Sequence, residues 1–310
     1  HMGCPHVCTF CNQSRITEVS GIGYLTPEYI TSTIKDYVGE SKSDKYWEVC
    51  FYGGSFSAIN QDLQRQLLLP AYEALKEGRI DGIRCSTRPD AVSDSQLELL
   101  CSYGMKTIEL GVQSMDDTVL SLAKRGHTSN DVKLAVKQLR KFGFTVGLQL
   151  LAGLLGDSWD TIIKTAVEIS QLQPDFVRIY PVLVIENTEL AEQYKTGIYE
   201  PLSLELALQY CSFLKDWFEQ HGIEVIRTGL QSTEELDSRN SLVAGPYEPA
   251  MGELVVNEQY KQRIERCIDE HVSQYKYLIS NDCFSLIEDA TYGSLKLSRV
   301  NVDNSGCIDN

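Results

Sequence analysis

No uninterrupted apolar run of about 18 residues occurs in this sequence, and its start shows none of the basic, apolar and small-residue order of a secretion signal. Linkers rich in proline or serine, internal repeats and low-complexity tracts are missing too. We therefore predict a folded, cytoplasmic protein without a membrane span. The 310 residues suit one α/β barrel with a small addition, and 43% of them are hydrophobic, enough for a large core.

The cysteines form no pattern of the kind that stabilises short secreted chains through disulfides. Three of the ten crowd into eight residues near the start. The other seven are scattered without regular spacing: Cys50, Cys85, Cys101, Cys211, Cys267, Cys283 and Cys307. We predict a reducing compartment, one thiolate cluster and seven structural or incidental thiols. A second cluster on Cys283 and Cys307 is the less favoured interpretation, because isolated thiols usually behave as small buried hydrophobes.

Positive charge is scarce, since 28 basic residues face 43 acidic ones and the formal net charge is −15. Such a protein does not attract nucleic acid over its whole surface, although a local patch can still do so. The basic residues Lys133, Lys137, Arg140 and Lys141 share one helical face. We interpret that face as the solvated outside of a helix rather than as an RNA contact.

Strand-like and helix-like segments alternate through the middle of the chain. The strand candidates are residues 47–52, 82–86, 106–112, 144–151, 175–180 and 223–228. The helix candidates are residues 61–76, 93–101, 131–142, 159–172 and 203–220. This alternation is typical of βαβ units, so we expect an α/β fold with an incomplete parallel (β/α)6-type barrel. Its chemistry should lie at the carboxyl ends of the strands.

The alternation stops at about residue 230, which predicts two parts. Residues 1–230 should form the partial barrel, and residues 231–310 should form a C-terminal extension with a helix at 257–274 and short strand-like pieces around Tyr277 and Leu295. The cysteine-rich loop should follow a strand. We therefore expect the first strand of the barrel to lie upstream of the numbered chain.

The clearest chemical signal is the C-x3-C-x2-C spacing of Cys4, Cys8 and Cys11. Three soft thiolates this close can wrap one face of an iron–sulfur cluster, a zinc ion or copper(I). Structural zinc needs four ligands and usually takes paired C-x2-C units, and no second pair is present. His6 could serve as a fourth zinc ligand, but it lies inside the same tight loop. Three thiolates suit a [4Fe-4S] cluster with one iron left open.

An open iron can chelate the amino and carboxylate groups of S-adenosylmethionine (SAM). One electron from the cluster then breaks the cofactor's C–S bond and yields a 5′-deoxyadenosyl radical, which abstracts hydrogen from a substrate. The competing interpretation is a zinc- or cluster-bearing binding protein that never turns over.

These motifs, in their order, resemble the radical SAM superfamily. GCPHVCTFCNQ at 3–13 is similar to its cluster loop, and YGGSF at 52–56 to its GGE-like motif. Within the superfamily the chain most resembles the radical SAM domain of the Elongator catalytic subunit and its bacterial relatives. That resemblance depends on STRPD (86–90), ELGVQS (109–114), RGHT (125–128), GLQLLAGLLGD (147–157) and RIYPVLVIENTEL (178–190). The resemblance to oxygen-independent coproporphyrinogen oxidase is weaker.

The resemblance implies roles for individual residues. Cys4, Cys8 and Cys11 would be the cluster ligands. The backbone of Gly53, Gly54 and Ser55 would meet the methionine amino group of SAM. Gln113, Arg125 and Gln149 would contact its ribose and carboxylate, and Ser86 would hydrogen-bond a ribose hydroxyl. Tyr180 should point toward this site, whereas His127 is either a proton donor or a packing residue.

The chain departs from the Elongator pattern in three respects. Ser86 stands where a glutamate is common, and Ser55 ends the GGE-like motif in place of an acid. The stretch after residue 230 is too short for an acetyltransferase domain, so full carboxymethylation of wobble uridine is not expected. RNA, with tRNA as the specific candidate, is one possible substrate, and a small molecule undergoing decarboxylation or rearrangement is the alternative. The expected electron donor is a flavodoxin or ferredoxin; the oligomeric state is not predicted.

Overall fold

The computed structural model describes residues 4, 6–12, 25–39, 45–238, 240–275, 301–302 and 308–309. Its chain divides into two compact units, His1–Val255 and Val256–Asn310. The division after residue 230 that the sequence suggests stays a prediction. Within the described residues, no helix is both long and apolar enough to cross a membrane.

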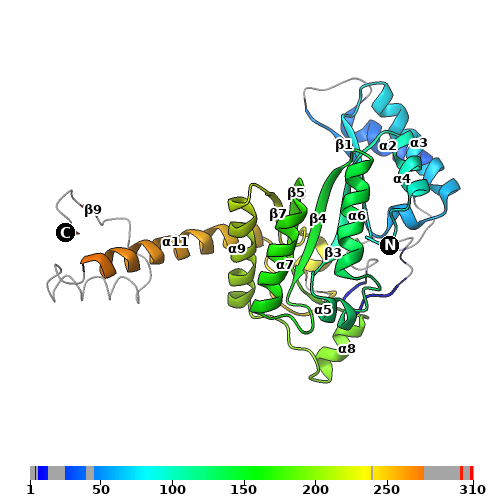
Figure 1. The fold of residues 1–310 in the computed structure, drawn as a ribbon. Helices are drawn as coiled ribbons and strands as arrows, with labels where there is room; N and C mark the ends of the chain where they lie inside the picture. Colours follow the sequence, from blue (N-terminus) through cyan, green and yellow to red (C-terminus); the bar gives the residue numbers. More distant parts are fainter. Residues whose placement is uncertain are drawn as a thin grey trace. The chain divides into compact units, whose positions relative to one another are not determined.

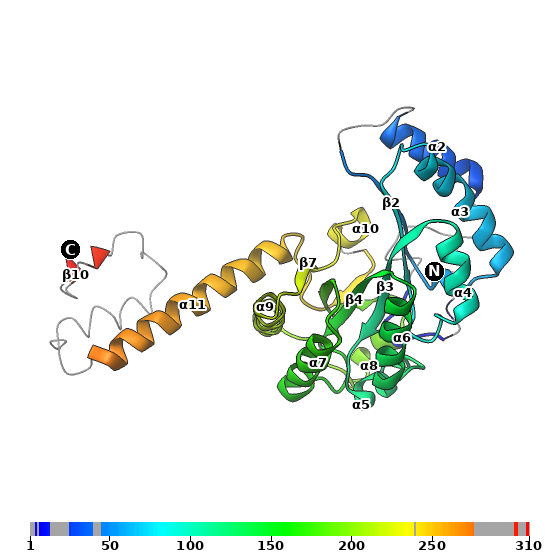
Figure 2. The same ribbon diagram turned by 45° about the horizontal axis from the view of Figure 1, so that its top comes forward.

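Six parallel strands form the sheet of the first unit, a curled half-barrel (Figures 1 and 2). They are β1 (Glu48–Phe51), β2 (Gly82–Thr87), β3 (Met105–Gln113), β4 (Thr145–Ala152), β5 (Phe176–Pro181) and β7 (Glu224–Thr228), side by side in that order. Every strand candidate, the parallel pairing and the incomplete barrel are confirmed. Because all six strands run the same way, their carboxyl ends meet at one edge of the sheet.

Five helices connect these strands and cover one face of the sheet (Figure 1). They are α3 (Gln61–Lys76), α4 (Asp94–Ser102), α6 (Ser129–Lys141), α7 (Trp159–Leu172) and α9 (Leu204–Gln220). Capping side chains set their starts: Ser158 Oγ accepts the Thr161 N–H at 3.4 Å at the start of α7, and Asn60 Oδ1 accepts the Asp62 N–H at 2.8 Å at the start of α3. All five predicted helices are confirmed.

The main hydrophobic core lies between the sheet and these helices. Alternate strand residues such as Ile108 and Leu148 are fully buried, and so is one face of each helix, as at Leu67 and Leu139. The sheet and helices therefore form one rigid support for the residues at the strand ends.

Several short elements were not predicted from the sequence. They are η2 (Phe56–Ala58), α5 (Asp117–Leu122), β6 (Val184–Ile185), α8 (Glu189–Lys195), α10 (Glu234–Asp237) and β8 (Leu242–Ala244), which pairs antiparallel with β6. None exceeds seven residues, so none shows a periodic pattern of its own. Helix α2 (Pro27–Val38) was not predicted either, because it precedes the region in which strand-like and helix-like segments alternate.

Helix α11 (Met251–Tyr275) contains the helix expected at 257–274. The second unit also holds one antiparallel pair, β9 (Asn301–Val302) and β10 (Ile308–Asp309). The strand-like pieces expected around Tyr277 and Leu295 lie outside the described residues, as do Cys283 and Cys307.

Candidate active site

A cavity of about 570 Å³ opens at the carboxyl ends of the strands. It is lined by all ten residues that the sequence analysis selected: Cys4, Cys8, Cys11, Gly53, Gly54, Ser55, Ser86, Gln113, Arg125 and Gln149. The structure thus brings together residues that are up to 145 positions apart in the chain. Their roles as cluster ligands and cofactor contacts stay predictions.

Thr9 anchors the cysteine loop between two short helices. Its buried backbone N–H donates to the Ala123 carbonyl beyond the end of α5 at 3.1 Å, and its carbonyl accepts the Leu190 N–H in α8 at 2.8 Å. Phe10 packs against the small apolar cluster that contains Leu190 and Val119. The two helices that the sequence did not predict therefore hold the loop at its middle.

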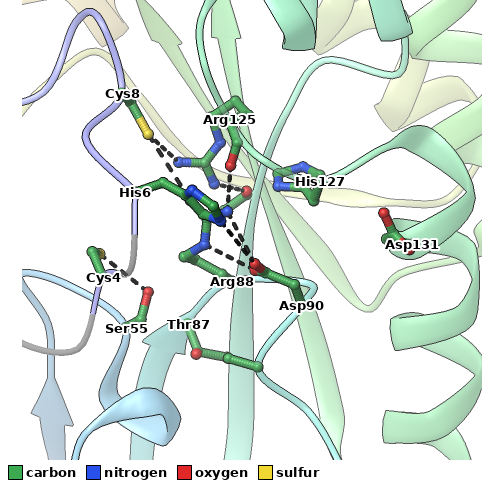
Figure 3. Close-up of polar contacts among 12 residues, drawn as sticks. Cys4, His6, Cys8, Ser55, Thr87, Arg88, Asp90, Arg125, His127 and Asp131 are labelled. Atoms are coloured by element: carbon green, nitrogen blue, oxygen red, sulfur yellow. Dashed lines mark hydrogen bonds and ion pairs between the residues drawn. The ribbon is translucent and has the colours of Figure 1, made fainter.

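The thiols of the loop face different polar groups (Figure 3). The Cys4 thiol lies 3.2 Å from the hydroxyl of Ser55, which is fully buried after β1. Cys8 is buried, and its sulfur accepts a hydrogen bond from Arg125 Nη1 at 3.1 Å. Arg88 Nη1 approaches the same sulfur at 4.0 Å. Two guanidinium groups therefore lie next to this one buried sulfur.

The donor set fits the [4Fe-4S] cluster predicted from the sequence. Three soft sulfur donors of one anchored loop line a single cavity. The sequence offers no second C-x2-C pair to complete a structural zinc site, which favours the cluster over the zinc alternative.

Arg125 is a buried cation without a carboxylate partner among the described residues. Besides the Cys8 sulfur, it contacts the Gly111 carbonyl, which accepts from Nη2 at 2.5 Å. Its Nε is buried and has no hydrogen-bond partner. Such a group costs free energy in the ligand-free protein. An anionic ligand in the cavity would relieve that cost.

The loop carrying Arg125 approaches the cysteine loop very closely. Gly126 has a φ of +71°, and a Cβ there would lie only 2.5 Å from the His6 ring. Only glycine combines this backbone conformation with this spacing. His6 Nε2 in turn lies 3.9 Å from Asp90 Oδ2, and Asp90 forms an ion pair with Arg88 at 2.8 Å. Figure 3 shows this chain of contacts between the cysteine loop and the end of β2.

Gln113 ends β3 in a strained conformation. Its φ is +75°, which is uncommon for a residue other than glycine, and the pairing register between β3 and β4 shifts between Gly111 and Gln113. Both residues line the cavity. Strain of this kind concentrates at functional sites, and here it places the Gln113 side chain in the cavity wall.

Below the cavity, Glu109 of β3 is the centre of a buried polar network. Its Oε1 accepts the Tyr52 hydroxyl at 2.5 Å, and its Oε2 lies 2.7 Å from Arg178 Nε. Arg84 Nη1 is 3.3 Å from Oε1, and Gln149 Nε2 donates to Oε2 at 3.1 Å. Burial, and then the nearby carboxylate, raises the pKa of Tyr52, so its hydroxyl stays protonated. The network fixes the orientation of Gln149 and Tyr52 in the cavity wall.

No role was predicted from the sequence for this network or for Arg227 of β7. The signal was present as charged residues inside the predicted parallel strands: Arg84, Glu109, Arg178 and Arg227. Ionised side chains in such strands are rare unless they are paired or functional. The partners of these charged residues could not be predicted from the sequence, because they depend on contacts across several strands.

Tyr180 and His127 differ in where they lie. Tyr180 lines the cavity, as expected. His127 does not line it; its Nε2 lies 3.3 Å from the Val112 carbonyl. Burial, followed by the positive charges of Arg125 and Arg88, lowers the pKa of His127 to about 4. The ring is therefore neutral at pH 7, which favours the packing role over the proton donor.

The basic face of α6 is outside the site, and three of its four cations pair with acidic side chains. Lys133 lies 2.7 Å from Glu168, Arg140 lies 2.6 Å from Asp175, and Lys141 lies 3.6 Å from Asp94. These pairs agree with the interpretation of α6 as an outer helix rather than an RNA contact.

A half-barrel with a polar, thiol-lined cavity at its strand ends is the architecture of an α/β-barrel enzyme. The sequence profile of the Radical SAM superfamily matches residues 1–169, and that of the radical SAM C-terminal domain matches residues 174–262. The chain therefore belongs to the radical SAM superfamily. Enzymes of this family use a [4Fe-4S] cluster and SAM and need an electron donor.

Three similar proteins place the chain within the superfamily. It is 31% identical over 230 residues to the uncharacterized protein MJ0486 of Methanocaldococcus jannaschii, covering 70% of this chain and 69% of that protein. It is 35% identical over 188 residues to the tRNA uridine(34) acetyltransferase of the same organism, covering 54% and 35%. The structure of Methanocaldococcus infernus Elp3 matches with a TM-score of 0.65 and 28% identity, covering 76% and 59%. The chain thus spans about a third of the acetyltransferase.

Proposed function

We propose that Cys4, Cys8 and Cys11 hold the cluster and that SAM binds along the β1–β4 side of the cavity. The residues we assign to SAM are Gly53, Gly54, Ser55, Ser86, Gln113, Arg125 and Gln149. When bound, the two groups supply a 5′-deoxyadenosyl radical that abstracts hydrogen from a substrate. Arg125 supports the assignment, because a buried guanidinium without an acidic partner among the described residues suits the methionine carboxylate.

We further propose that the substrate is RNA, with tRNA as the first candidate. The observation that carries this proposal is the similarity to archaeal Elp3 and to a tRNA uridine(34) acetyltransferase, at 28% and 35% identity. The reaction would begin with hydrogen abstraction from a nucleoside. The net charge of −15 favours a small-molecule substrate instead, which makes that the second candidate.

The remaining proposals concern the surroundings of the reaction. We assign the electron donor to the flavodoxin or ferredoxin type. Seven of the ten cysteines are scattered without the regular spacing of a disulfide framework. This pattern supports a reducing compartment such as the cytoplasm.

The test is anaerobic reconstitution with iron and sulfide, followed by dithionite and SAM, with and without total tRNA. Mass spectrometry would quantify 5′-deoxyadenosine and the nucleosides of the digested tRNA. We expect tRNA to stimulate 5′-deoxyadenosine formation and a nucleoside of altered mass to appear. Cys8→Ala should abolish both signals, whereas Cys101→Ala, which changes an exposed thiol on α4, should leave both intact.

The outcomes separate the candidates. Formation of 5′-deoxyadenosine that does not respond to RNA, with no altered nucleoside, would exclude tRNA and leave the small-molecule candidate. Equal activity of Cys8→Ala and the unmodified protein would refute the assignment of the cysteines.

A further inference from the structure

The cavity has two sides with different chemistry. The residues assigned to the cluster and to SAM come from the cysteine loop, the segment after β1, strands β2 to β4 and the segment after α5. The polar residues that β5, β7 and the loop after β7 contribute to the cavity wall are Arg178, Tyr180, Arg227, Gln231 and Thr233. We call these five residues the β5–β7 side. Nothing in the assignment of SAM uses them, so this side of the cavity is free for the substrate.

Strand register places two arginines of this side next to each other. Gln149 of β4 is the pairing partner of Arg178 in β5, and Arg178 is the partner of Arg227 in β7. Paired residues on neighbouring strands lie about 5 Å apart and project to the same face of the sheet. All three line the cavity, so a row runs from a SAM-assigned residue to Arg227 at the last strand.

The charges in the cavity wall are unbalanced. Of the described residues that line the cavity, four are arginines and none is a lysine, aspartate or glutamate. Two of the four are neutralised by acids just outside the wall, since Arg88 pairs with Asp90 at 2.8 Å and Arg178 pairs with Glu109 at 2.7 Å. Arg125 and Arg227 have no carboxylate partner among the described residues.

The contacts that Arg227 makes with described residues orient its guanidinium through neutral acceptors. Its Nε donates to the Gly229 carbonyl at 3.3 Å, and Nη1 donates to Gln231 Oε1 at 3.2 Å. Both acceptors are neutral and belong to the loop that directly follows its own strand. Within the described part of the chain, Nη2 has no such acceptor. A half-buried, fixed guanidinium with a spare N–H group is suited to an anionic ligand.

We propose that Arg227 binds a phosphate group of the substrate, next to the nucleotide that receives the radical. This inference rests on the proposed RNA substrate and assigns its recognition to the β5–β7 side. A phosphate is the anion that every RNA substrate presents on each side of its target base. Tyr180, Gln231 and Thr233 add polar groups around the same position.

The proposal also accounts for the charge of the molecule. A protein with a net charge of −15 repels RNA at long range, so binding must depend on local positive charge that no acid cancels. Arg227, which has no acidic partner among the described residues, provides such a charge inside the cavity. On the basic face of α6, by contrast, three of the four cations pair with Glu168, Asp175 and Asp94.

The test compares Arg227→Gln, Arg227→Lys and Arg65→Gln, all as full chains with reconstituted cluster. Arg65 is exposed on α3, so its replacement makes the same change of charge away from the cavity. Fluorescence anisotropy with labelled total tRNA at several salt concentrations gives the affinity and its salt dependence. In parallel, the thermal unfolding of each protein is followed with increasing inorganic phosphate.

We expect Arg227→Gln to bind tRNA about 10- to 100-fold more weakly, as the loss of one charged hydrogen bond predicts. The slope of log affinity against log salt should become shallower by about 0.7–0.9, the value for one phosphate contact. Arg227→Lys should be intermediate, because it keeps the charge and loses the fork. Arg65→Gln should match the unmodified chain, and thermal unfolding without phosphate shows whether each variant is folded.

The tRNA and phosphate measurements together show whether the phosphate site at Arg227 or the proposed RNA substrate is wrong. If tRNA binds the unmodified chain and Arg227→Gln equally well with the same salt slope, the phosphate site is overturned while RNA remains the substrate. If tRNA does not bind, but inorganic phosphate stabilises the unmodified chain and not Arg227→Gln, the site stands and its phosphate belongs to a small molecule. If neither probe depends on Arg227, the inference is overturned.

Discussion

Arg178 and Arg125 line the same cavity but differ in what balances their charge. Arg178 lies 2.7 Å from the fully buried carboxylate of Glu109 and also contacts the Tyr52 hydroxyl. Arg125 contacts a sulfur and a backbone carbonyl, and its Nε has no partner. The charge of Arg178 is neutralised within the protein, whereas the charge of Arg125 is not balanced by any acid among the described residues.

The difference indicates different roles for two residues of the same type. A neutralised arginine with several protein contacts holds the wall of the cavity in place. An arginine without an acid is stabilised only when an anion enters, so its charge is available for binding. By this criterion Arg125 belongs with Arg227, and Arg178 belongs with the supporting network.

The largest effect should come from Glu109→Gln. The change keeps the shape of the side chain but leaves Arg178 as an uncompensated buried charge, and it weakens the contact with Arg84. We expect the free energy of unfolding to fall by about 3–5 kcal/mol, measured by chemical denaturation of the ligand-free protein. Gln149 should also lose its fixed orientation, because its acceptor is a Glu109 oxygen.

A surface pair serves as the control for this prediction. Glu189 forms an ion pair with Lys124 at 2.7 Å, and both side chains are largely exposed. Glu189→Gln should change the free energy of unfolding by less than about 1 kcal/mol. If Glu109→Gln proves as stable as this control, the buried network does not support the cavity wall.

Arg125→Gln should have a small effect on stability and a large effect on SAM binding, unlike Glu109→Gln. Without SAM, the variant should lose only about 1–2 kcal/mol, the worth of two hydrogen bonds, because no buried acid is left behind. Affinity for SAM should fall about 10- to 100-fold with the loss of a charged, bidentate contact. Calorimetric titration of SAM into anaerobically reconstituted protein measures this directly.

Arg125→Lys is the matched variant, because it keeps the positive charge but lacks the planar guanidinium. Its affinity for SAM should lie between those of Arg125→Gln and the unmodified chain. A SAM affinity of Arg125→Gln equal to that of the unmodified chain would show that the unbalanced charge serves another ligand. The contrast with Arg178 would then lose its functional meaning.

Much of this fold could be predicted from the sequence because its signals are local. Short β-prone runs and amphipathic segments such as 131–142 identified the strands and long helices, and parallel strands necessarily gather their carboxyl ends. That rule alone brings Gly53, Ser86 and Gln149 to one cavity. Helices α5 and α8 were missed because six and seven residues are too few for a periodic pattern.

The buried networks could not be predicted in the same way. Glu109 contacts residues of β2, β4 and β5 and the residue after β1, so its partners are fixed by the register of several strand pairs at once. Register depends on the whole sheet rather than on any one segment. The lack of an acidic partner for Arg125 and Arg227 among the described residues could not be predicted either, because it depends on which residues surround each arginine in the folded protein.

The smallest effect concerns His127, which lies next to Arg125. Burial is the largest cause that lowers the pKa of His127 to about 4, followed by the charges of Arg125 and Arg88; Asp90 opposes them. The unfolded chain binds a proton near pH 6.5 and the folded chain only near pH 4, so this part of the stability is complete above pH 6.5. It is lost as the pH falls toward 4. Between pH 7.5 and 5.5 we expect a loss of about 1 kcal/mol.

Chemical denaturation at a series of pH values measures this loss, and His127→Gln isolates it. The glutamine can still donate to the Val112 carbonyl but carries no titrating group, so the difference in stability between the two proteins should shrink or reverse on acidification. Combining the comparison with Arg125→Gln sharpens it further, because removing that charge should raise the pKa of His127 and reduce the acid loss. A pH profile that His127→Gln leaves unchanged would mean that the titration of His127 does not contribute to the acid loss of stability.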